Sequence, residues 1–399
     1  MSENYKQKLY YQNSYLSNLK TKIIDHKIAE DENWYTFEHT IFYPGGGGQS
    51  ADTGLINSHE LKKIKIENGQ IWHLVPVPIS NPVNLQLDWN FRYMNMQQHT
   101  GQHILSSVLY KLFNFETVSV HLGRENTLIE LDTKEITSKQ IAHAEMTCHK
   151  IIRDSIEIKE IWPEKSEISK YTLRREIKIN SKNIRLIKIG DLDCTGCGGT
   201  HVNSTAEVGL IKIIGFEKIR GRIRIQAKIG ESAYNYFKEL HDVFSELVNQ
   251  FSSGLGELAE NISNLAQSNK SLKRTLKKRT KLWLELSAKD LITESVCGIF
   301  FFDDLQMDEG LLFSSLWTER HKKCCFVVIG NGQFRKMIFR VLPDKRWKAN
   351  EIINDIKEKI FFKGGGNEQF VQGEIDFKNK NNKEFKLFLQ KVFENLIKQ

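Results

Sequence analysis

The stretch that decides the fold is QQHTGQHIL, residues 97–105, which places His99 and His103 four positions apart. Apolar residues around it recur at helical spacing, so we expect a helix over residues 93–113. Positions i and i+4 share one face of a helix, where both imidazoles could point at a single ion. The acid that follows the first His in metalloproteases is missing here. Two buried histidines with ordinary hydrogen bonds are the alternative interpretation.

A second stretch, DLDCTGCGGTHV at 191–202, offers Cys194, Cys197 and His201. The two glycines before Thr200 predict a tight turn that lets Cys197 and His201 reach one ion. A redox Cys-x-x-Cys pair competes with this interpretation but lacks its usual strand-to-helix context. The metal interpretation gives a nitrogen and sulfur donor set that suits zinc, namely His99, His103, Cys197 and His201. Four protein ligands are typical of structural zinc, whereas catalysis needs an open position, and the spacing decides neither.

Composition sets broad limits on the class of protein. A chain of 399 residues is too long for one ordinary core, so two to four domains are expected. The net charge of +8 permits a polyanionic partner such as nucleic acid without requiring one. The N-terminus lacks the apolar core of a signal peptide, and no apolar run reaches the length of a membrane span. A cytoplasmic protein is expected, with six cysteines that are thiols or metal ligands.

The pattern along the chain predicts a multidomain α+β protein. Residues 1–92 carry short apolar runs broken by Gly, Asn and Pro, as strands do. Residues 93–230 combine the histidine helix, a second helix and several strands into the zinc-containing domain. Residues 231–290 have helical periodicity and contain no Pro, and residues 291–399 alternate strands with helices as a small α/β domain.

The helical segment carries an apolar seam with 4-3-4-3-4 spacing: Leu258, Ile262, Leu265, Asn269, Leu272 and Leu276. This spacing predicts a coiled coil, within the chain or in a homodimer, or else an amphipathic helix packed on its own domain. SSGLG at 252–256 either divides the segment or only kinks it. Beyond it, GNG after Ile329 indicates a hairpin turn, and KGGGN at 363–367 lacks the Gly-Lys-Ser/Thr of a P-loop.

HTGQH followed about a hundred residues later by CGGTHV resembles the paired motifs of the alanyl-tRNA synthetase editing domain and of the free-standing AlaX proteins. TIFYPGGGGQSADTG (40–54) resembles the family's glycine-rich barrel motif, although Gly45 stands where an acidic residue is expected. KGGGNEQFVQGEI (363–375) resembles the signature of the synthetase's C-terminal DHHA1 domain, with Glu374 in place of a further glycine. The resemblance implies a long-form AlaX protein with a β-barrel over residues 1–92 and no aminoacylation core.

The resemblance implies hydrolysis of the ester that joins a wrong amino acid, serine or glycine, to the 3′ end of alanine tRNA. An alanine pocket rejects glycine poorly and refuses an added hydroxyl poorly, so a second site must sort by another criterion. One zinc ion would be held by His99, His103, Cys197 and His201. It would either activate the attacking water or orient the aminoacyl group, and no side chain is assigned as catalytic.

Further contacts are expected from the same resemblance. Four residues of TVSVHLG (117–123) are expected at the amino-acid pocket: His121, Gly123, Thr117 and Ser119. The glycine motif, expected against the editing site, contributes Gly46, Gly47, Gly48 and Gln49. Contacts with tRNA are expected from Arg220, Arg222, Lys273, Lys277, Gly364, Gly365 and Gly366. Plain turns and a solvated charged face are the alternatives for these last two groups.

Two other functions compete with editing of alanine tRNA. One is a zinc hydrolase of another aminoacyl ester, such as mischarged threonine tRNA. The other is a tRNA-binding protein that carries a structural zinc and has no hydrolytic activity.

Overall fold

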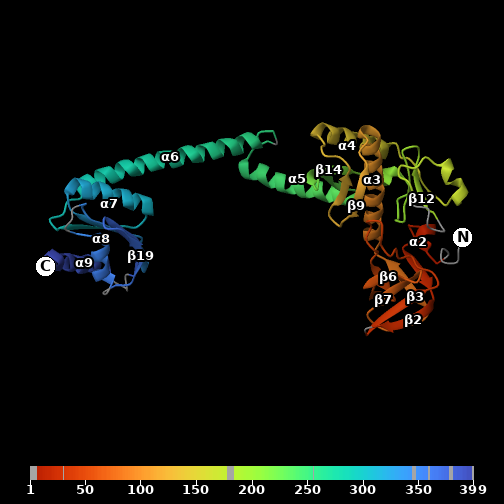
Figure 1. The fold of residues 1–399 in the computed structure, drawn as a ribbon, viewed down its shortest axis with the longest axis horizontal. Coiled ribbons are helices and arrows are strands. Elements are labelled where there is room, and N and C mark those ends of the chain that lie inside the picture. The colour runs from red at the N-terminus through yellow and green to blue at the C-terminus, as the bar shows by residue number, and fades with distance from the viewer. Residues whose placement is uncertain are drawn as a thin grey trace. The chain divides into compact units, whose positions relative to one another are not determined.

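The structure, a computed structural model, describes residues 7–29, 31–177, 184–254, 256–343, 347–357, 360–376 and 381–397. The chain divides into two compact units, Met1–Leu247 and Val248–Gln399. Each unit contains both helices and sheets, so the protein is a multidomain α+β protein, as predicted (Figure 1).

The first part of the N-terminal unit consists of two four-stranded antiparallel sheets and the short helix α2 (Leu9–Gln12). One sheet has the order β1-β8-β4-β5, with bounds Asn18–Thr21, Val83–Leu87, Gly54–Ile56 and His59–Glu60. The other has the order β2-β3-β7-β6, with bounds Ile23–Ala29, Glu32–Phe37, Gln70–Val75 and Lys63–Glu67. Both sheets contribute to one core, for example through Phe37, Val75, Ile56 and Leu85. Closure of these sheets into a barrel stays a prediction.

Helix α3 (Trp89–Phe113) is the predicted histidine helix, and it starts four residues earlier than expected. Asp88 caps it by accepting a hydrogen bond from the Phe91 amide, which satisfies one of the free N–H groups of the first turn. Arg92, fully buried, pairs with Asp52 and donates to the Ile41 carbonyl at 2.6 Å, which fixes α3 to the preceding strands. Figure 1 shows α3 running from these sheets to α4.

The rest of the N-terminal unit surrounds α3. A four-stranded sheet has the order β14-β15-β10-β9, with bounds Ile211–Ile219, Arg222–Ile229, Thr127–Leu131 and Thr117–Leu122. A three-stranded sheet has the order β11-β12-β13, with bounds Ile158–Ile161, Leu186–Ile189 and Asp193–Gly196. Helix α4 (Ser138–Arg153) is the predicted second helix, and the reciprocal hydrogen bonds of Thr137 and Gln140 cap it. Two short 3-10 helices span Lys165–Lys170 and Thr205–Val208.

The predicted helical segment consists of two helices, α5, which ends at Phe251 (Glu231–Phe251), and α6, which begins at Leu258 (Leu258–Asp290). Leu258 at the start of α6 is buried. Four later seam positions are 41–69% exposed: Ile262, Leu265, Leu272 and Leu276. No packing partner covers them among the described residues, so the coiled coil and the homodimer stay predictions.

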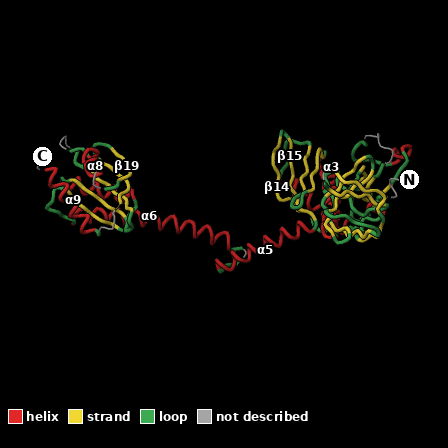
Figure 2. The backbone as a smooth tube through the Cα atoms, turned by 90° about the horizontal axis from the view of Figure 1, so that it is seen from below, coloured by secondary structure: helices red, strands yellow, loops and turns green. Residues whose placement is uncertain are grey.

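The C-terminal unit is built on one five-stranded sheet with the order β16-β17-β18-β20-β19. Its strands span Cys297–Phe302, Cys324–Ile329, Phe334–Arg340, Phe370–Asp376 and Phe362–Gly366. The first two strands pair in parallel and all other neighbours are antiparallel, including the predicted hairpin at GNG. Figure 2 shows this group of strands in yellow with the helices of the unit around it.

Helices cover both faces of that sheet. One core lies between the sheet and helices α6 and α7 (Met307–His321), and contains Phe313, Trp317 and Val327. The other lies between the sheet and helices α8 (Ala349–Lys357) and α9 (Asn382–Ile397). Across the described residues, no helix has both the length and the apolarity that crossing a bilayer requires.

Candidate metal centre

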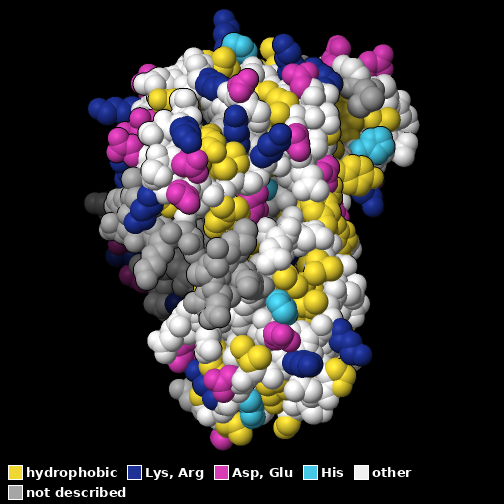
Figure 3. Space-filling model, turned by 90° about the vertical axis from the view of Figure 1, so that its right-hand side faces the viewer, with side chains coloured by type: hydrophobic (Ala, Val, Ile, Leu, Met, Phe, Trp, Pro, Cys, Tyr) yellow, Lys and Arg dark blue, Asp and Glu magenta, His cyan; other side chains and the backbone are white. Residues whose placement is uncertain are grey.

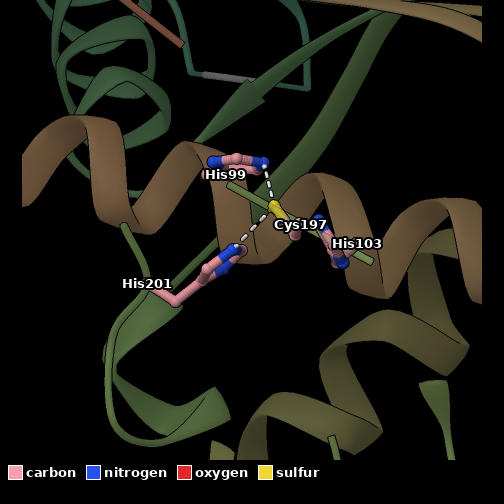
Figure 4. A group of neighbouring side chains, drawn as sticks. All are labelled: His99, His103, Cys197 and His201. Atoms are coloured by element: carbon pink, nitrogen blue, oxygen red, sulfur yellow. Dashed lines mark hydrogen bonds between the residues drawn. The ribbon is translucent and has the colours of Figure 1, made fainter. Parts of the chain in front are cut away.

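The four predicted ligands converge on one point. His99 and His103 project from α3, and Cys197 and His201 come from the turn after β13 (Figure 4). The Cys197 Sγ atom lies 3.3 Å from the Nε2 atoms of both His99 and His201. The potential ligand atoms of the four residues all lie within 4.8 Å of one another. Both the helical pair and the turn predicted from the sequence are therefore present, with side chains that face a common centre.

Each histidine is held through its outer nitrogen. The Nδ1 atom of His99 lies 2.9 Å from Gln49 Oε1, and that of His201 lies 3.1 Å from Thr100 Oγ1. The Nδ1 atom of His103 lies 3.2 Å from Asp193 Oδ2. A hydrogen bond at Nδ1 fixes the imidazole tautomer and leaves Nε2 available as a ligand. This arrangement of outer partners is typical of metal-binding histidines.

The turn that carries Cys197 needs glycine at position 199. A Cβ atom on Gly199 would lie 2.1 Å from His99 Cε1, closer than real atoms approach. The turn is also held from behind by the buried Arg185, whose Nη1 donates to the carbonyls of Cys197 at 2.8 Å and Gly199 at 2.7 Å. The Arg185 guanidinium lies over the ring of Tyr11, 4.8 Å from its centroid. The turn is therefore held between His99, which lies against Gly199, and Arg185, which binds its carbonyl groups.

The side chains of the cluster determine each other's protonation. Burial alone raises the pKa of the Cys197 thiol, but the surrounding imidazoles outweigh burial and bring its pKa well below the ordinary value. Burial lowers the pKa of His103, but the Cys197 thiolate and Asp193 outweigh it and raise that pKa to about 9. Burial and His99 lower the pKa of His201 to about 3. The cluster therefore favours a thiolate, the form in which cysteine binds metals.

These residues fit a metal ion of the zinc class. Three imidazole nitrogens and one thiolate are the donors that tetrahedral zinc sites use. Cys194, the partner in the alternative redox pair, is buried among Ile168, Ile184 and Leu186 and is not part of the cluster. Burial raises its pKa, which makes it less reactive as a thiol. The structure thus separates the two cysteines of the Cys-x-x-Cys motif.

The cluster lies beside an open cavity of about 730 Å³, within the size range of small-molecule sites. Gly47, Gln102, Thr117 and Ser119 are among the residues that line it. Gln102 Nε2 donates to Ser106 Oγ at 2.7 Å, and Thr117 Oγ1 donates to the same oxygen at 2.9 Å. A row of polar groups therefore runs along the wall of the cavity next to His99 and His103.

The other residues expected at the substrate site are placed differently. Gln49 contacts His99 and the Thr200 hydroxyl and thus supports the cluster, while Gly46 and Gly48 belong to the turn that carries it. Ser119 Oγ donates to Glu130 at 2.9 Å. His121 and Gly123 are absent from the described lining of the cavity, because the lining part of β9 ends at Val120.

The residues expected to contact tRNA fall into three groups. Arg222 pairs with Asp132 at 3.2 Å, and Arg220 lies in the turn between β14 and β15. Lys273 and Lys277 are exposed on α6. The glycine stretch 364–366 forms part of the edge strand β19, where a Cβ on Gly364 would lie 2.3 Å from the Gln372 carbonyl oxygen. Close strand pairing therefore explains Gly364 and Gly366, whereas a Cβ on Gly365 would meet nothing within 4 Å.

Sequence reasoning missed the residues that support the site. Asp193 accepts from Arg174 Nε at 2.7 Å while it holds His103. Arg185, Arg174 and Gln102 carried no motif that distinguished them from other polar residues. Asp193 directly precedes the Cys-x-x-Cys stretch. Its position beside the candidate ligands was the sequence signal that could have identified it as a supporting residue.

Comparison with known proteins identifies the family. A family model described as the threonyl and alanyl tRNA synthetase second additional domain matches residues 184–225, which include Cys197 and His201. The alanyl-tRNA editing protein AlaX-L of Pyrococcus horikoshii is 30% identical over 390 residues, which cover 93% of this chain and 95% of that protein. This chain belongs to the AlaX family of alanyl-tRNA editing proteins.

Other relatives match parts of this AlaX-family chain. The rat alanyl-tRNA editing protein Aarsd1 is 34% identical over 185 residues, 45% of each chain. An alanine–tRNA ligase of Saccharolobus islandicus is 29% identical over 254 residues, 58% of this chain and 27% of the ligase. The solved C-Ala domain of Aquifex aeolicus alanyl-tRNA synthetase covers 26% of this chain at 19% identity, with a TM-score of 0.22; the match covers 96% of that domain.

Proposed function

We propose that this protein is a trans-editing deacylase in the cytoplasm that hydrolyses serine, and also glycine, from mischarged alanine tRNA. Water adds to the carbonyl carbon of the aminoacyl ester, the bond to the ribose 3′ oxygen breaks, and a free amino acid and an intact tRNA 3′ hydroxyl result. The observation that carries this proposal is the inward-facing cluster of His99, His103, Cys197 and His201 beside an open cavity in a chain of the AlaX family.

The cluster is proposed to bind one zinc ion. Zinc supplies a Lewis acid that polarises an ester carbonyl or a water molecule. The chain's own groups would do the rest. Gln49, Thr100 and Asp193 hold the three imidazoles in place through Nδ1. Arg185 keeps the carbonyls of the Cys197 turn fixed, so that the ligand geometry does not relax when substrate enters.

Selection of serine over alanine is proposed to rest on the polar wall of the cavity. Thr117 and Gln102 both donate to the Ser106 hydroxyl, which leaves their remaining lone pairs for a hydroxyl on the substrate. A site built to bond a hydroxyl discriminates strongly against an analogue that lacks it. The methyl group of alanine would occupy the place of that hydroxyl without bonding to these polar groups, whereas glycine would leave the place free for a water molecule that bonds to them, so correctly charged tRNA would be spared.

The test is a deacylation assay on alanine tRNA charged separately with serine, glycine and alanine. We expect loss of serine and glycine with alanine retained, and no loss in a His103→Ala variant that is folded by circular dichroism. Threonine tRNA charged with serine is assayed in parallel. Hydrolysis of that substrate alone would assign the protein to threonine tRNA. A folded, zinc-loaded protein that binds tRNA and hydrolyses none of these esters would be a binding protein with a structural zinc.

A further inference from the structure

Two smaller hollows adjoin the metal cavity. One, of about 440 Å³, is lined by Tyr110, Thr117 and Arg174 among others, and the next, of about 500 Å³, is lined by Tyr110 and Arg174 among others. Arg174 lines both hollows and the metal cavity, and Thr117 lines the metal cavity and the first hollow. Because Arg174 is common to all three linings, the hollows lie side by side around this residue and make up the depression beside the metal cluster.

The far part of this depression is rich in lysine and tyrosine. We call it the lysine groove and define it by Tyr110, Lys111, Lys170, Tyr171 and Lys188. These side chains come from α3, from the 3-10 helix and the residue after it, and from β12. Three separate segments of the chain therefore place cations on one concave surface, whereas a solvated charged face needs only one.

The charges in the lysine groove remain available to an anion. Lys111 Nζ donates to the main-chain carbonyl of Asp191 at 2.8 Å, a contact that leaves its positive charge uncompensated. Lys170 pairs with Glu167 at an exposed position, where such a pair is weak. The Asp193 carboxylate in the same hollow already accepts from Arg174 and contacts His103. Three lysines and Arg174 therefore line this hollow together with two acids, Asp191 and Asp193, so basic residues outnumber acidic ones in it.

The groove is distinguished by its combination of cations with aromatic rings and not by charge alone, since helix α6 also carries many exposed lysines and arginines. Figure 3 shows one face of the molecule, on which Lys and Arg side chains alternate with Asp and Glu. In the groove, the lysines are combined with two half-buried tyrosines, Tyr110 and Tyr171. A cationic groove with aromatic side chains is the combination that holds single-stranded nucleic acid, since phosphates pair with lysine and bases stack on rings.

The distance from the metal cluster fits a short single strand. Lys111 follows His103 by eight residues on α3, and a helix rises about 1.5 Å per residue, so the two lie about 12 Å apart along the axis. Stacked nucleotides rise about 3.4 Å each, so this span corresponds to about three nucleotides. Every tRNA ends in a single-stranded tail of about that length, with the amino acid on its last ribose.

We propose that the lysine groove binds the backbone and bases of the single-stranded 3′ tail of the substrate RNA, while the terminal aminoacyl nucleotide occupies the metal cavity. This inference rests on the proposed deacylase function. The groove is the path by which the RNA would reach the metal cavity, and neither the ligand motifs nor the family assignment locates that path. The phosphates contact Lys111 and Lys188, and a base stacks on Tyr110.

The first test compares two substrates that carry the same seryl ester. Wild type and a Lys111→Ala/Lys188→Ala variant are assayed on seryl-tRNA(Ala) and on 3′-O-seryl-adenosine, which fills the metal cavity only. We expect the variant to lose kcat/KM on the tRNA by roughly tenfold and to stay within twofold of wild type on the adenosine ester. The matched control is Lys134→Ala/Lys139→Ala, which removes the same charge from exposed positions outside the described hollows and should change neither.

The second test measures binding without chemistry. A fluorescent minihelix of the alanine acceptor stem is compared with the same minihelix lacking its single-stranded tail. Wild type should bind the tailed form more tightly, and the double variant should lose that difference. Its logarithmic salt slope should also fall by about 1.4, because a single-strand phosphate contact contributes about 0.7.

Stacking on Tyr110 has its own pair of variants. Tyr110→Phe keeps the ring and should retain kcat/KM on seryl-tRNA(Ala) within twofold, whereas Tyr110→Leu should lose at least fivefold. A loss of equal size in both variants would assign the effect to the hydroxyl and contradict stacking.

The outcomes separate the two proposals. If wild type hydrolyses both esters and the double variant is unimpaired on tRNA, the groove is wrong and the deacylase stands. Equal losses on both esters would show damage to the metal cavity and would also overturn the groove. If wild type hydrolyses neither ester, the deacylase fails. In that case the minihelix comparison alone tests the groove, because equal binding of the minihelices with and without the tail would contradict it.

Discussion

Gln49 shows how much of the metal centre depends on residues that are not ligands. Its Oε1 atom accepts from the Thr200 amide at 3.0 Å and lies 2.9 Å from His99 Nδ1. One amide therefore joins the glycine-rich loop, the histidine helix and the cysteine turn. Partners of this kind set the orientation and basicity of a ligating imidazole.

Replacement of Gln49 by Ala should therefore weaken metal binding. We expect zinc affinity to fall about 10- to 100-fold, because His99 loses the partner that fixes its tautomer. A competition titration with a chromophoric chelator measures the affinity. The control is Gln102→Ala, which removes the same side chain type from α3 without touching a ligand imidazole. An unchanged affinity in Gln49→Ala would show that His99 is positioned without it.

His73 gives a prediction about pH and stability. This residue of β7 has a buried side chain that contacts Thr40 Oγ1 at 2.9 Å, and burial lowers its pKa from 6.5 to about 4. Below pH 6.5 the unfolded chain therefore takes up a proton that the folded chain does not. Stability falls as pH decreases through this window and is unaffected by this group above it.

The expected loss is about 2 kcal/mol in the free energy of unfolding between pH 7.5 and pH 5.0. Urea titrations at the two pH values measure it, and a His73→Gln variant should lose less than wild type over the same interval. Replacing the exposed His59 by Gln serves as the control and should leave the pH dependence of wild type intact. Equal pH dependence in wild type and His73→Gln would contradict the assignment.

At the scale of elements, α3 has to approach β15 very closely. A Cβ atom on Gly101 would lie 2.4 Å from Ile229 Cγ2 and 3.0 Å from Val208 Cγ1. Gly101 lies between the two ligand histidines, so its close contact also sets the depth at which His99 and His103 sit. Glycine in a helix normally costs about 1 kcal/mol relative to Ala, and here packing explains its presence.

Gly101→Ala should therefore destabilise the N-terminal unit by about 1–3 kcal/mol despite the better helix propensity of Ala. Urea denaturation followed by circular dichroism measures this change. Gly215→Ala in β14 is the matched control, because its Cβ would meet nothing within 4 Å. A Gly101→Ala protein as stable as wild type would mean that α3 can move away from β15 without loss.

The element types could be predicted from the sequence wherever periodicity was strong. Helices α3, α4, α5 and α6 follow from apolar spacing and from the cap at Thr137, and the cluster follows from the spacing of its ligands. Helix α7 lies within the predicted α/β domain, but its own helical pattern is weak because the sequence MDEGLLFSSLWTERH contains Gly310 and adjacent serines. In the structure Gly310 packs against Ile329 of the sheet, a contact that only the tertiary fold reveals.

The supporting residues of the site could not be predicted for a similar reason. Asp193, Arg174 and Arg185 act through side chains that come from other segments, and local sequence carries no signal for such pairs. His121 was expected in the cavity from resemblance alone, and the course of β9 takes it beyond the described lining. The candidate ligands can thus be recognised from short stretches of sequence, whereas the residues that hold them in place depend on how distant segments meet in the fold.

At the scale of the whole molecule, the two units carry different parts of the proposed function. All four candidate metal ligands lie in the first unit, while Lys273 and Lys277 are exposed on α6 in the second. Phosphate contacts of such lysines strengthen binding without reading sequence. The second unit is therefore proposed to raise affinity for the tRNA body.

A fragment of residues 1–251, which ends with α5, should keep kcat on seryl-tRNA(Ala) within about twofold and raise KM roughly tenfold. Steady-state kinetics on the fragment and the full chain provide the comparison. The second unit alone should hydrolyse nothing. Equal KM values for fragment and full chain would remove the tRNA-binding role of residues 252–399.

The ligands of the metal cluster come from two places about a hundred residues apart in the chain, a helix that precedes most of the domain and a turn near its end. A bound ion would join these two places only in the folded chain, so its binding free energy would add to the stability of the fold. Unlike a covalent link, a bound ion can dissociate from the folded chain. With the proposed zinc as that ion, a shortage of zinc would lower the stability of this protein together with its proposed deacylase activity.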